Sequence, residues 1–340
     1  MSKPISFGLG PLSQFPLRDW QSLAPHIEQL GYRTLWIPDE RFYRDVVTTL
    51  SVIAESTARL GLGTAVTDPY VRHPALTAQW TASLDALSRG RMHVGIGAGF
   101  AGFSAMGIEH DRPALAIREM VDLMRRLWQG GTVDMQGQTV SFHQAALDFQ
   151  TLRERIPCYI AGRGKLILRL AGEIGEGVIL GSLAAEGGLR YAFSHIDAGL
   201  DRSGRAREDL DVAIWLHTAV APDRQQARQA VRMIVVGVLL SSLGVLEELG
   251  VELGAELQQI LSSLRYIHGS PEMMATAAML PDGIIDQFAV AGPPEEVAGR
   301  IGALREAGVN HIALKPWLVP GQSFSDYIEL VAEEVMPRVS

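Results

Sequence analysis

Residues 60–96 read LGLGTAVTDPYVRHPALTAQWTASLDALSRGRMHVGI, and this stretch decides the fold. Its first apolar run, Leu60–Val66, predicts a strand. Pro74 then opens a long helical pattern, in keeping with the preference for proline in the first turn of a helix. A second apolar run, Met92–Ile96, predicts another strand. A strand, a helix and a second strand in this order are typical of a parallel sheet with crossover helices.

The same alternation runs from one end of the chain to the other. Short apolar or β-branched runs predict eight strands, at residues 5–9, 34–37, 60–66, 92–96, 158–161, 177–180, 210–220 and 311–314. Longer helical patterns predict helices at residues 18–30, 45–58, from 74 onward, and at 113–129, 165–174 and 294–307. Eight strands that alternate with helices indicate an α/β fold, the (β/α)8 TIM barrel. A barrel with insertions accommodates all 340 residues, so we expect a single domain over residues 1–340.

Two parts of the chain are longer than a barrel requires. After the fourth strand comes a Gly-rich loop, residues 98–112, and later a stretch, 131–147, that predicts a hairpin with its turn at Gln136-Gly137. After the seventh strand, residues 223–286 predict two or more extra helices. We therefore expect insertions after strands 4 and 7, and long loops of this kind are usually functional.

Composition limits the classes of partner. The formal net charge is −8, and no cluster of basic residues is present to bind a phosphate backbone, so we expect no nucleic-acid partner. The apolar stretch Ala230–Leu249 is interrupted by charged and polar residues, so we expect no membrane span. Cys158 is the single cysteine and the first residues lack a signal-peptide pattern, which favours the cytoplasm. A small-molecule substrate is the expected partner.

The loops after barrel strands gather on one face, which is where barrel enzymes place their chemistry. Four such segments here are distinctive: WIPDERF at 36–42, TAVTDPYVRHP at 64–74, GIGAG at 95–99 and AGRGK at 161–165. Together they resemble the bacterial-luciferase-like superfamily, and most closely its branch around the methylenetetrahydromethanopterin reductases. The resemblance covers residues 5–181 and, more weakly, 288–315. It implies a TIM barrel, two-electron redox chemistry with coenzyme F420, and a homodimer or larger assembly.

The resemblance also implies roles for particular residues. Asp39 corresponds to the acidic residue near the tricyclic ring of the cofactor, and Asp39 and Glu40 are candidate proton donors or acceptors. Ala65-Val66, followed by Thr67, falls where the family often has a non-prolyl cis peptide against the ring face. The alternative is that Asp39 caps a helix or loop.

Three strand-end segments offer contacts for a cofactor. Gly97, Ala98 and Gly99 leave the backbone open to close approach by a flat ring, or they simply form a tight turn. The residues Gly162, Arg163, Gly164 and Lys165 open a helix, so free amides and two cations converge on an anion, for which phosphate is the natural guest. The alternative is a glycine-rich turn with a solvated basic pair. Lys315 follows strand eight, where barrels commonly bind phosphate.

Three further side chains are candidates for substrate contact. His73 precedes Pro74 and either faces the site, caps the helix or packs beneath the ring. Trp215 and His217 lie two apart on one side of a strand, so they either meet substrate or pack inside the barrel. No cluster of residues has metal-ligand spacing, and no Gly-x-Ser-x-Gly elbow suggests a serine hydrolase.

These features favour an F420-dependent oxidoreductase that transfers a hydride to or from a small organic substrate. An FMN-dependent monooxygenase served by a separate reductase is the alternative, and a cofactor-free barrel with a binding or structural role is a third. The first strand reads Phe7-Gly8-Leu9-Gly10 where the pterin reductases carry a carboxylate. This departure counts against methylenetetrahydromethanopterin as the substrate.

Overall fold

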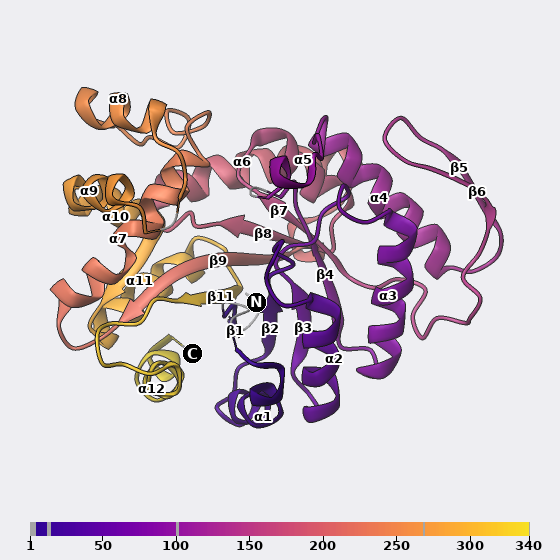
Figure 1. Ribbon diagram of the computed structural model, residues 1–340, viewed down its shortest axis with the longest axis horizontal. Coiled ribbons are helices and arrows are strands. Elements are labelled where there is room, and N and C mark those ends of the chain that lie inside the picture. The colour runs from indigo at the N-terminus through magenta and orange to yellow at the C-terminus, as the bar shows by residue number, and fades with distance from the viewer. Residues whose placement is uncertain (1–4, 12–14, 100–101, 268, 340) are drawn as a thin grey trace. The chain divides into compact units, whose positions relative to one another are not determined.

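The computed structural model describes residues 5–11, 15–99, 102–267 and 269–339 (Figure 1). Eight strands match the eight predicted from the sequence: β1 (Ser6–Leu9), β2 (Thr34–Ile37), β3 (Gly61–Thr64), β4 (Met92–Ile96), β7 (Cys158–Gly162), β8 (Gly177–Gly181), β9 (Asp211–Val220) and β11 (His311–Pro316). A further strand, β10 (Ala289–Gly292), was not predicted. The strands pair in the order β10-β9-β11-β1-β2-β3-β4-β7-β8, and β8 also pairs with β9. This order closes the sheet and confirms the TIM-barrel fold.

The chain divides into two compact units. We call Gly8–Ile179 with His195–Asp211 the N-terminal unit, and Met1–Phe7 with Leu180–Ser194 and Val212–Ser340 the C-terminal unit. Three strands, β1, β8 and β9, and the helix α6 (Glu186–Ser203) have residues in both units. The single domain expected from the sequence stays a prediction.

The helices of the N-terminal unit follow the predicted pattern closely. They are α1 (Trp20–Gln29), α2 (Val46–Ser56), α3 (Pro74–Leu87), α4 (Pro113–Trp128) and α5 (Lys165–Ile174), with 3-10 turns at Leu17–Asp19, Ser104–Met106 and Arg207–Asp209. The predicted hairpin is present as β5 (Val133–Gln136) and β6 (Ser141–Ala145). The buried indole of Trp128 on α4 donates to the carbonyl of Ala78 on α3 at 3.0 Å, which joins the two helices.

Close packing explains one of the glycines in the sheet. Trp36 of β2 lies in register with Gly63 of β3, and its indole covers the glycine. A Cβ atom at position 63 would lie 2.2 Å from that ring, so only glycine leaves room for the tryptophan. Strand β3 ends at Thr64, two residues earlier than predicted, because the chain turns at a cis peptide between Ala65 and Val66.

The C-terminal unit contains the predicted helical insertion after strand seven. Its helices are α7 (Arg224–Leu240), α8 (Ala255–Ser263), α9 (Pro271–Met279) and α10 (Asp282–Phe288). The chain continues through α11 (Pro294–Glu306), α12 (Phe324–Leu330), a π-helical turn (Val331–Val335) and α13 (Met336–Val339). Of these later helices only α11 was predicted, and α6 (Glu186–Ser203) was missed although it is long. Its first turn holds Gly187 and Gly188, which weakens the helical signal there.

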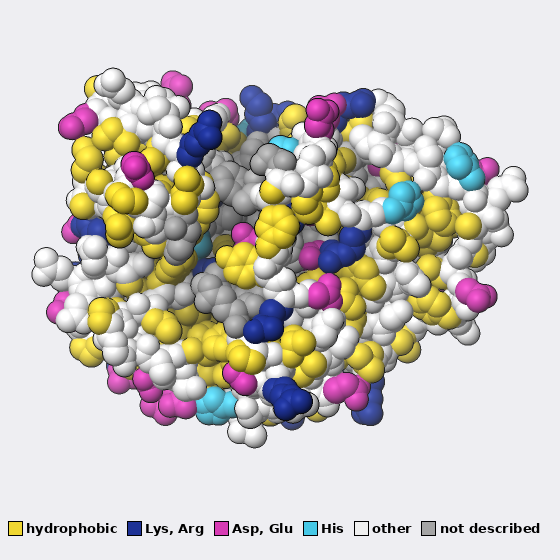
Figure 2. Space-filling view, in the orientation of Figure 1, with side chains coloured by type: hydrophobic (Ala, Val, Ile, Leu, Met, Phe, Trp, Pro, Cys, Tyr) yellow, Lys and Arg dark blue, Asp and Glu magenta, His cyan; other side chains and the backbone are white. Residues whose placement is uncertain are grey.

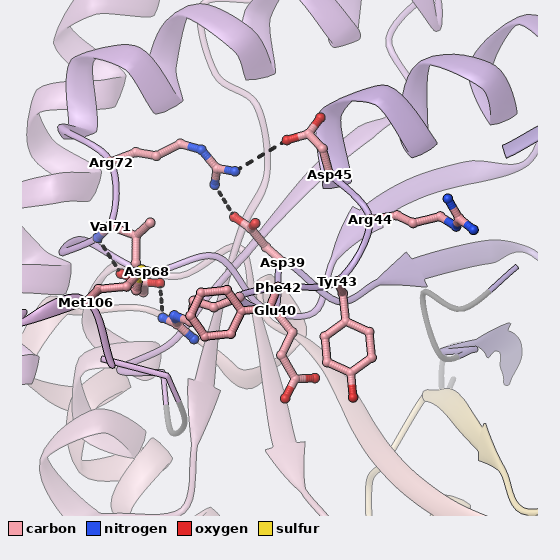
Figure 3. A pocket seen from close by; sticks show the side chains of 11 residues that line it. Asp39, Glu40, Phe42, Tyr43, Arg44, Asp45, Asp68, Val71, Arg72 and Met106 are labelled. Atoms are coloured by element: carbon pink, nitrogen blue, oxygen red, sulfur yellow. Dashed lines mark hydrogen bonds and ion pairs between the residues drawn. The ribbon is translucent and has the colours of Figure 1, made fainter. Parts of the chain in front are cut away.

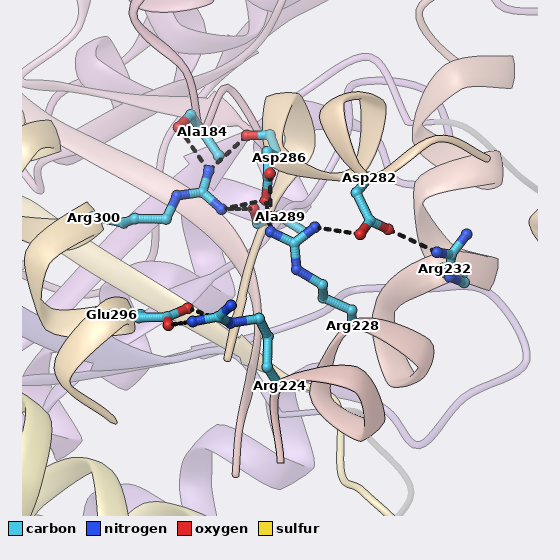
Figure 4. Close-up of polar contacts among 9 residues, drawn as sticks. All are labelled: Ala184, Arg224, Arg228, Arg232, Asp282, Asp286, Ala289, Glu296 and Arg300. Atoms are coloured by element: carbon cyan, nitrogen blue, oxygen red, sulfur yellow. Dashed lines mark hydrogen bonds and ion pairs between the residues drawn. The ribbon is translucent and has the colours of Figure 1, made fainter. Parts of the chain in front are cut away.

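Ion pairs fix the insertion to its neighbours (Figure 4). Three arginines four residues apart lie on one face of α7 and bind carboxylates of α10 and α11. The pairs are Arg224 with Glu296, Arg228 with Asp282 and Asp286, and Arg232 with Asp282. Arg300 of α11 also binds Asp286, at 2.9 Å. The sequence pattern alone predicted extra helices here but not this set of partners.

On the face drawn in Figure 2, acidic and basic side chains are interspersed among apolar ones. Within the described part of the chain, no helix combines the length and apolar character needed to cross a membrane.

Candidate functional site at the strand ends

Four segments of the N-terminal unit extend the ends of neighbouring parallel strands. Asp39 and Glu40 follow β2, Ala65–Thr67 follow β3, Gly97–Gly99 follow β4, and the segment ending at Lys165 follows β7. Because β2, β3, β4 and β7 are adjacent and parallel, their carboxyl ends lie along one edge of the sheet. The structure therefore brings these four predicted segments to the same edge.

The segment after β3 has the backbone geometry that the family resemblance implied. The Ala65–Val66 peptide is cis. The amide of Ala65 donates to the carbonyl of Ile37 at 2.9 Å, and that of Thr67 donates to the carbonyl of Gly95, also at 2.9 Å. The segment is thus held between the ends of β2 and β4, and the predicted cis peptide is confirmed.

The two glycines after β4 are packed against the protein's own side chains. A Cβ atom at Gly97 would lie 2.7 Å from Cγ2 of Val66. Gly99 has φ of 73°, and a Cβ atom there would lie 2.6 Å from the ring of Phe103 and 2.7 Å from the guanidinium of Arg41. The room that these glycines leave is therefore filled by Val66, Phe103 and Arg41, and their contact with a cofactor stays a prediction.

An arginine holds the candidate catalytic carboxylate (Figure 3). Arg72 donates to the carboxylate of Asp39 and lies 3.6 Å from that of Asp45. Burial alone would lower the pKa of Arg72, but the hydrogen bond and charge of Asp39, with the charges of Asp45 and Asp68, raise the pKa above its usual value. Asp39 therefore has a cationic partner. It does not cap α2, because Asp45 does so by accepting from the amide of Thr48.

A second pair lies beside the first. Arg41 donates to Asp68, and their side chains are only 8% and 3% exposed. The other oxygen of Asp68 accepts from the amides of Tyr70 and Val71, at 2.8 and 2.9 Å. The guanidinium of Arg41 lies 3.9 Å from the ring centroid of Phe103, a cation–π contact. Arg41 therefore joins the loop after β3 to the loop after β4.

These residues surround a cavity of about 250 Å³. Its lining comes from the segment Asp39–Asp45 together with Asp68, Val71, Arg72 and Met106. Four carboxylates and three arginines contribute charged groups to the wall, while Phe42 and Tyr43 add aromatic surface. The cavity suits a small, partly polar ligand.

The predicted anion site is at the start of α5. Gly164 is the N-cap residue and Lys165, which is exposed, begins the helix. Arg163 is half-buried, and burial lowers the pKa of its guanidinium to about 10, so it is charged at neutral pH. Two cations and the free amides of one helix terminus therefore lie within a single turn, an arrangement that suits a phosphate group.

The C-terminal unit has its own group of strand-end side chains. Trp215 and His217 lie on β9, and Lys315 on β11 is the register partner of His217. The ammonium of Lys315 lies 5.2 Å from the ring centroid of Trp215. The indole N–H of Trp317, a residue that sequence reasoning missed, donates to Nδ1 of His217 at 2.9 Å. Lys315 and His217 are 7% and 5% exposed, so the structure buries both.

Comparison with known proteins identifies the family of this chain. The model of the luciferase-like monooxygenase family matches residues 4–311 of the 340. The chain belongs to this family. It is 32% identical to the 5,10-methylenetetrahydromethanopterin reductase of Archaeoglobus fulgidus over 98% of this chain and 100% of the relative. It is 29% identical to the F420-dependent glucose-6-phosphate dehydrogenase of Intrasporangium calvum, over 95% of both chains.

Solved structures of the family agree with the fold. The coenzyme F420 dependent tetrahydromethanopterin reductase from Methanopyrus kandleri superposes with a TM-score of 0.86 at 28% identity, over 99% of this luciferase-like chain and 100% of the other. An F420-dependent secondary alcohol dehydrogenase has a TM-score of 0.80 at 22% identity, which is a likeness in fold.

The remaining candidates of this luciferase-like chain differ in their surroundings. His73 is exposed and caps α3 by accepting from the amide of Ala75 at 3.2 Å, and its Nε2 lies 3.2 Å from the carbonyl of Ser141. The capping alternative thus accounts for His73. Glu40 is exposed, and burial, followed by the charge of Glu40, raises the pKa of Tyr43. Among described residues, no group of three or more histidine, cysteine or acidic side chains could hold a metal ion.

Proposed function

We propose that this protein is an F420-dependent oxidoreductase that transfers a hydride between the deazaflavin and a small organic substrate. The observation that carries the proposal is the full-length similarity to relatives named as F420-dependent enzymes or as methylenetetrahydromethanopterin reductases, which spans every strand-end segment. The methylenetetrahydromethanopterin reductase of Archaeoglobus fulgidus matches at 32% identity, whereas two solved monooxygenases match at 22% and 18%.

The donor set at the start of α5 fits the phosphate of such a cofactor. Arg163 and Lys165 supply two positive charges, and the backbone from Gly162 to Gly164 supplies the approach to the helix terminus. We assign the ring to the segments Ala65–Thr67 and Gly97–Gly99, and Lys315 is a further candidate for an anionic group. When bound, the deazaflavin supplies the hydride chemistry, which the side chains alone cannot.

The side chains supply the proton chemistry. Asp39 lines the cavity beside Arg72, so we assign Asp39 the role of accepting a proton from the substrate hydroxyl in the oxidative direction. The same residue returns the proton in the reverse direction. Glu40, exposed at the rim, is the second candidate for this role.

We propose a substrate other than methylenetetrahydromethanopterin. Strand β1 reads Ser6-Phe7-Gly8-Leu9 and carries no carboxylate at the position where the resembling reductases have one. A small alcohol or carbonyl compound, or an unsaturated one, suits the cavity of about 250 Å³ beside Asp39 and Arg72. We also propose that the enzyme works in the cytoplasm as a homodimer, and analytical ultracentrifugation of the purified protein would test the dimer.

The experiment is a pair of titrations of the purified protein, one with F420 and one with FMN, followed by fluorescence. We expect saturable binding of F420 and clearly weaker binding of FMN. Isolation with tightly bound FMN would instead support the flavin monooxygenase, and absence of binding to either would support a cofactor-free barrel.

A further inference from the structure

A tight turn forms one side of the cavity in the N-terminal unit. It comprises residues 40–43, and the amide of Tyr43 donates to the carbonyl of Glu40 at 3.2 Å. Phe42, the third residue of this turn, has φ of 68°, in the left-handed region. Glycine or asparagine usually occupies such a position, because a larger side chain raises the conformational free energy of the backbone there. The phenylalanine therefore destabilises the turn relative to glycine.

Packing does not account for this phenylalanine. The side chain of Phe42 is 77% exposed, so it contributes little buried apolar surface to the fold. The turn is held instead by its second residue, Arg41, whose buried side chain donates to Asp68. Phe42 is one of the residues that line the cavity (Figure 3). Its ring therefore adds a flat apolar surface to the cavity and little to the core.

The cavity lining has a charged part and an apolar part. The charged part includes the two ion pairs described above, in which no side chain is more than 27% exposed. Because each of these arginines already binds a carboxylate, the two pairs carry no net charge, which favours a neutral polar group over an anion. The apolar part consists of three more exposed side chains, Phe42, Tyr43 and Met106. Two of these are aromatic, and aromatic rings pack together more favourably than their buried area alone predicts. The lining is thus complementary to a neutral polar end joined to a flat aromatic body.

We propose that Phe42 is a specificity-determining residue, whose exposed ring packs against an aromatic ring of the substrate. The substrate class is a small aromatic alcohol or the matching carbonyl compound. Its oxygen lies toward Asp39 and Arg72, and its ring lies against Phe42. The role of this compound as a substrate rests on the proposed function, whereas the preference for binding a flat ring does not.

The preference is tested with two alcohols that share a hydroxymethyl group, benzyl alcohol with a flat ring and cyclohexylmethanol with a saturated one. Ligand-observed NMR gives both dissociation constants on the purified protein, without cofactor and with reduced F420, which does not oxidise an alcohol. We expect the wild type to bind benzyl alcohol about fivefold more tightly, the effect of one aromatic pair. Phe42→Leu should remove this preference, whereas Phe42→Tyr, which keeps a ring, should retain it.

Two further variants separate substrate recognition from folding. Phe149→Leu replaces another exposed phenylalanine of the N-terminal unit, outside the cavity lining, and should keep the preference. Phe42→Gly relieves the left-handed backbone, so it should lose the preference while unfolding at a urea concentration no lower than that of the wild type.

Several results would overturn the proposal: equal affinities of the wild type for the two alcohols, no binding of either, or an unchanged preference in Phe42→Leu. Earlier unfolding of Phe42→Gly, or a change in its molecular mass in solution, would do so too, because the ring would then stabilise the fold or a contact between copies of the chain. A protein that prefers benzyl alcohol but binds no F420 would support this inference while refuting the proposed function. One that binds F420 without the preference would refute this inference alone.

Discussion

The strand ends of the two units present polar groups in different ways. In the N-terminal unit the charges are paired, Arg72 with Asp39 and Arg41 with Asp68. In the C-terminal unit the contacts are between aromatic and nitrogen groups, with Trp317 donating to His217 and Lys315 over Trp215. Removing one member of a buried charge pair leaves a lone charge, whereas removing a neutral donor leaves an unfilled acceptor, which costs less. Substitutions at the strand ends of the N-terminal unit should therefore lower the free energy of unfolding more than those in the C-terminal unit.

The largest expected effect is on cofactor affinity at the start of α5. The double substitution Arg163→Ala and Lys165→Ala removes two contacts to an anion, each worth about 1.5–3 kcal/mol, so the dissociation constant for F420 should rise at least about a hundredfold. The free energy of unfolding should change little. Fluorescence titration measures the first and urea denaturation the second. Arg190→Ala, an exposed arginine of α6, is the control and should bind F420 normally.

The substitution Arg72→Ala should give the next largest effect. It leaves the carboxylate of Asp39, only 12% exposed, without its cation, and should lower the free energy of unfolding by about 1.5–3 kcal/mol as well as slow turnover. Arg72→Lys keeps a charge and should recover part of both losses. Asp45→Asn removes only the 3.6 Å contact and should have little effect. Wild-type turnover in Arg72→Ala would show that the pair has no part in the chemistry.

A substitution that disturbs packing in the N-terminal unit should lower the free energy of unfolding somewhat less. Gly97→Ala places a Cβ atom 2.7 Å from Val66, and the resulting strain should lower the free energy of unfolding by about 1–2 kcal/mol. Gly302→Ala, in α11 with no atom within 4 Å of the added carbon, is the control and should be neutral or slightly stabilising. Equal stability of the two variants by urea denaturation would mean that Val66 moves aside freely.

The smallest effect is expected in the C-terminal unit. Trp317→Phe keeps an aromatic ring but removes the neutral hydrogen bond to His217, so it should lower the free energy of unfolding by only about 0.5–1.5 kcal/mol. Thermal or urea denaturation beside Arg72→Ala measures the difference. A loss as large as that of Arg72→Ala would contradict the contrast drawn between the two regions.

Much of the fold was predictable from the sequence because it depends on local pattern. The alternation of apolar runs and helical stretches located all eight barrel strands, and Pro74 marked the first residue of α3. The sequence analysis missed helix α6 because two glycines weaken the helical pattern in its first turn. It missed strand β10 because this strand is a short apolar run next to a helix.

The sequence predicted where the site residues lie along the strands, but not which other side chains contact them. Asp39 and Lys315 lie at or just after strand ends, which a sequence can show, whereas their contacts depend on residues far away in the chain. Arg72 lies 33 residues from Asp39, and Trp317 lies 100 residues from His217. Arg72 lies within the strand-end segment 64–74, and its positive charge was a sequence signal for a partner of the Asp39 carboxylate. Periodicity carries no information about which distant side chains meet.

The most direct test of the account measures oxygen and the deazaflavin during turnover. The purified enzyme is supplied with F420 and a panel of small alcohols, and with reduced F420 and the matching carbonyl compounds, with and without oxygen. We expect the absorbance of F420 to change one-to-one with substrate conversion, at the same rate under both atmospheres and without oxygen uptake. Turnover that needs reduced FMN and consumes oxygen as product forms would contradict it.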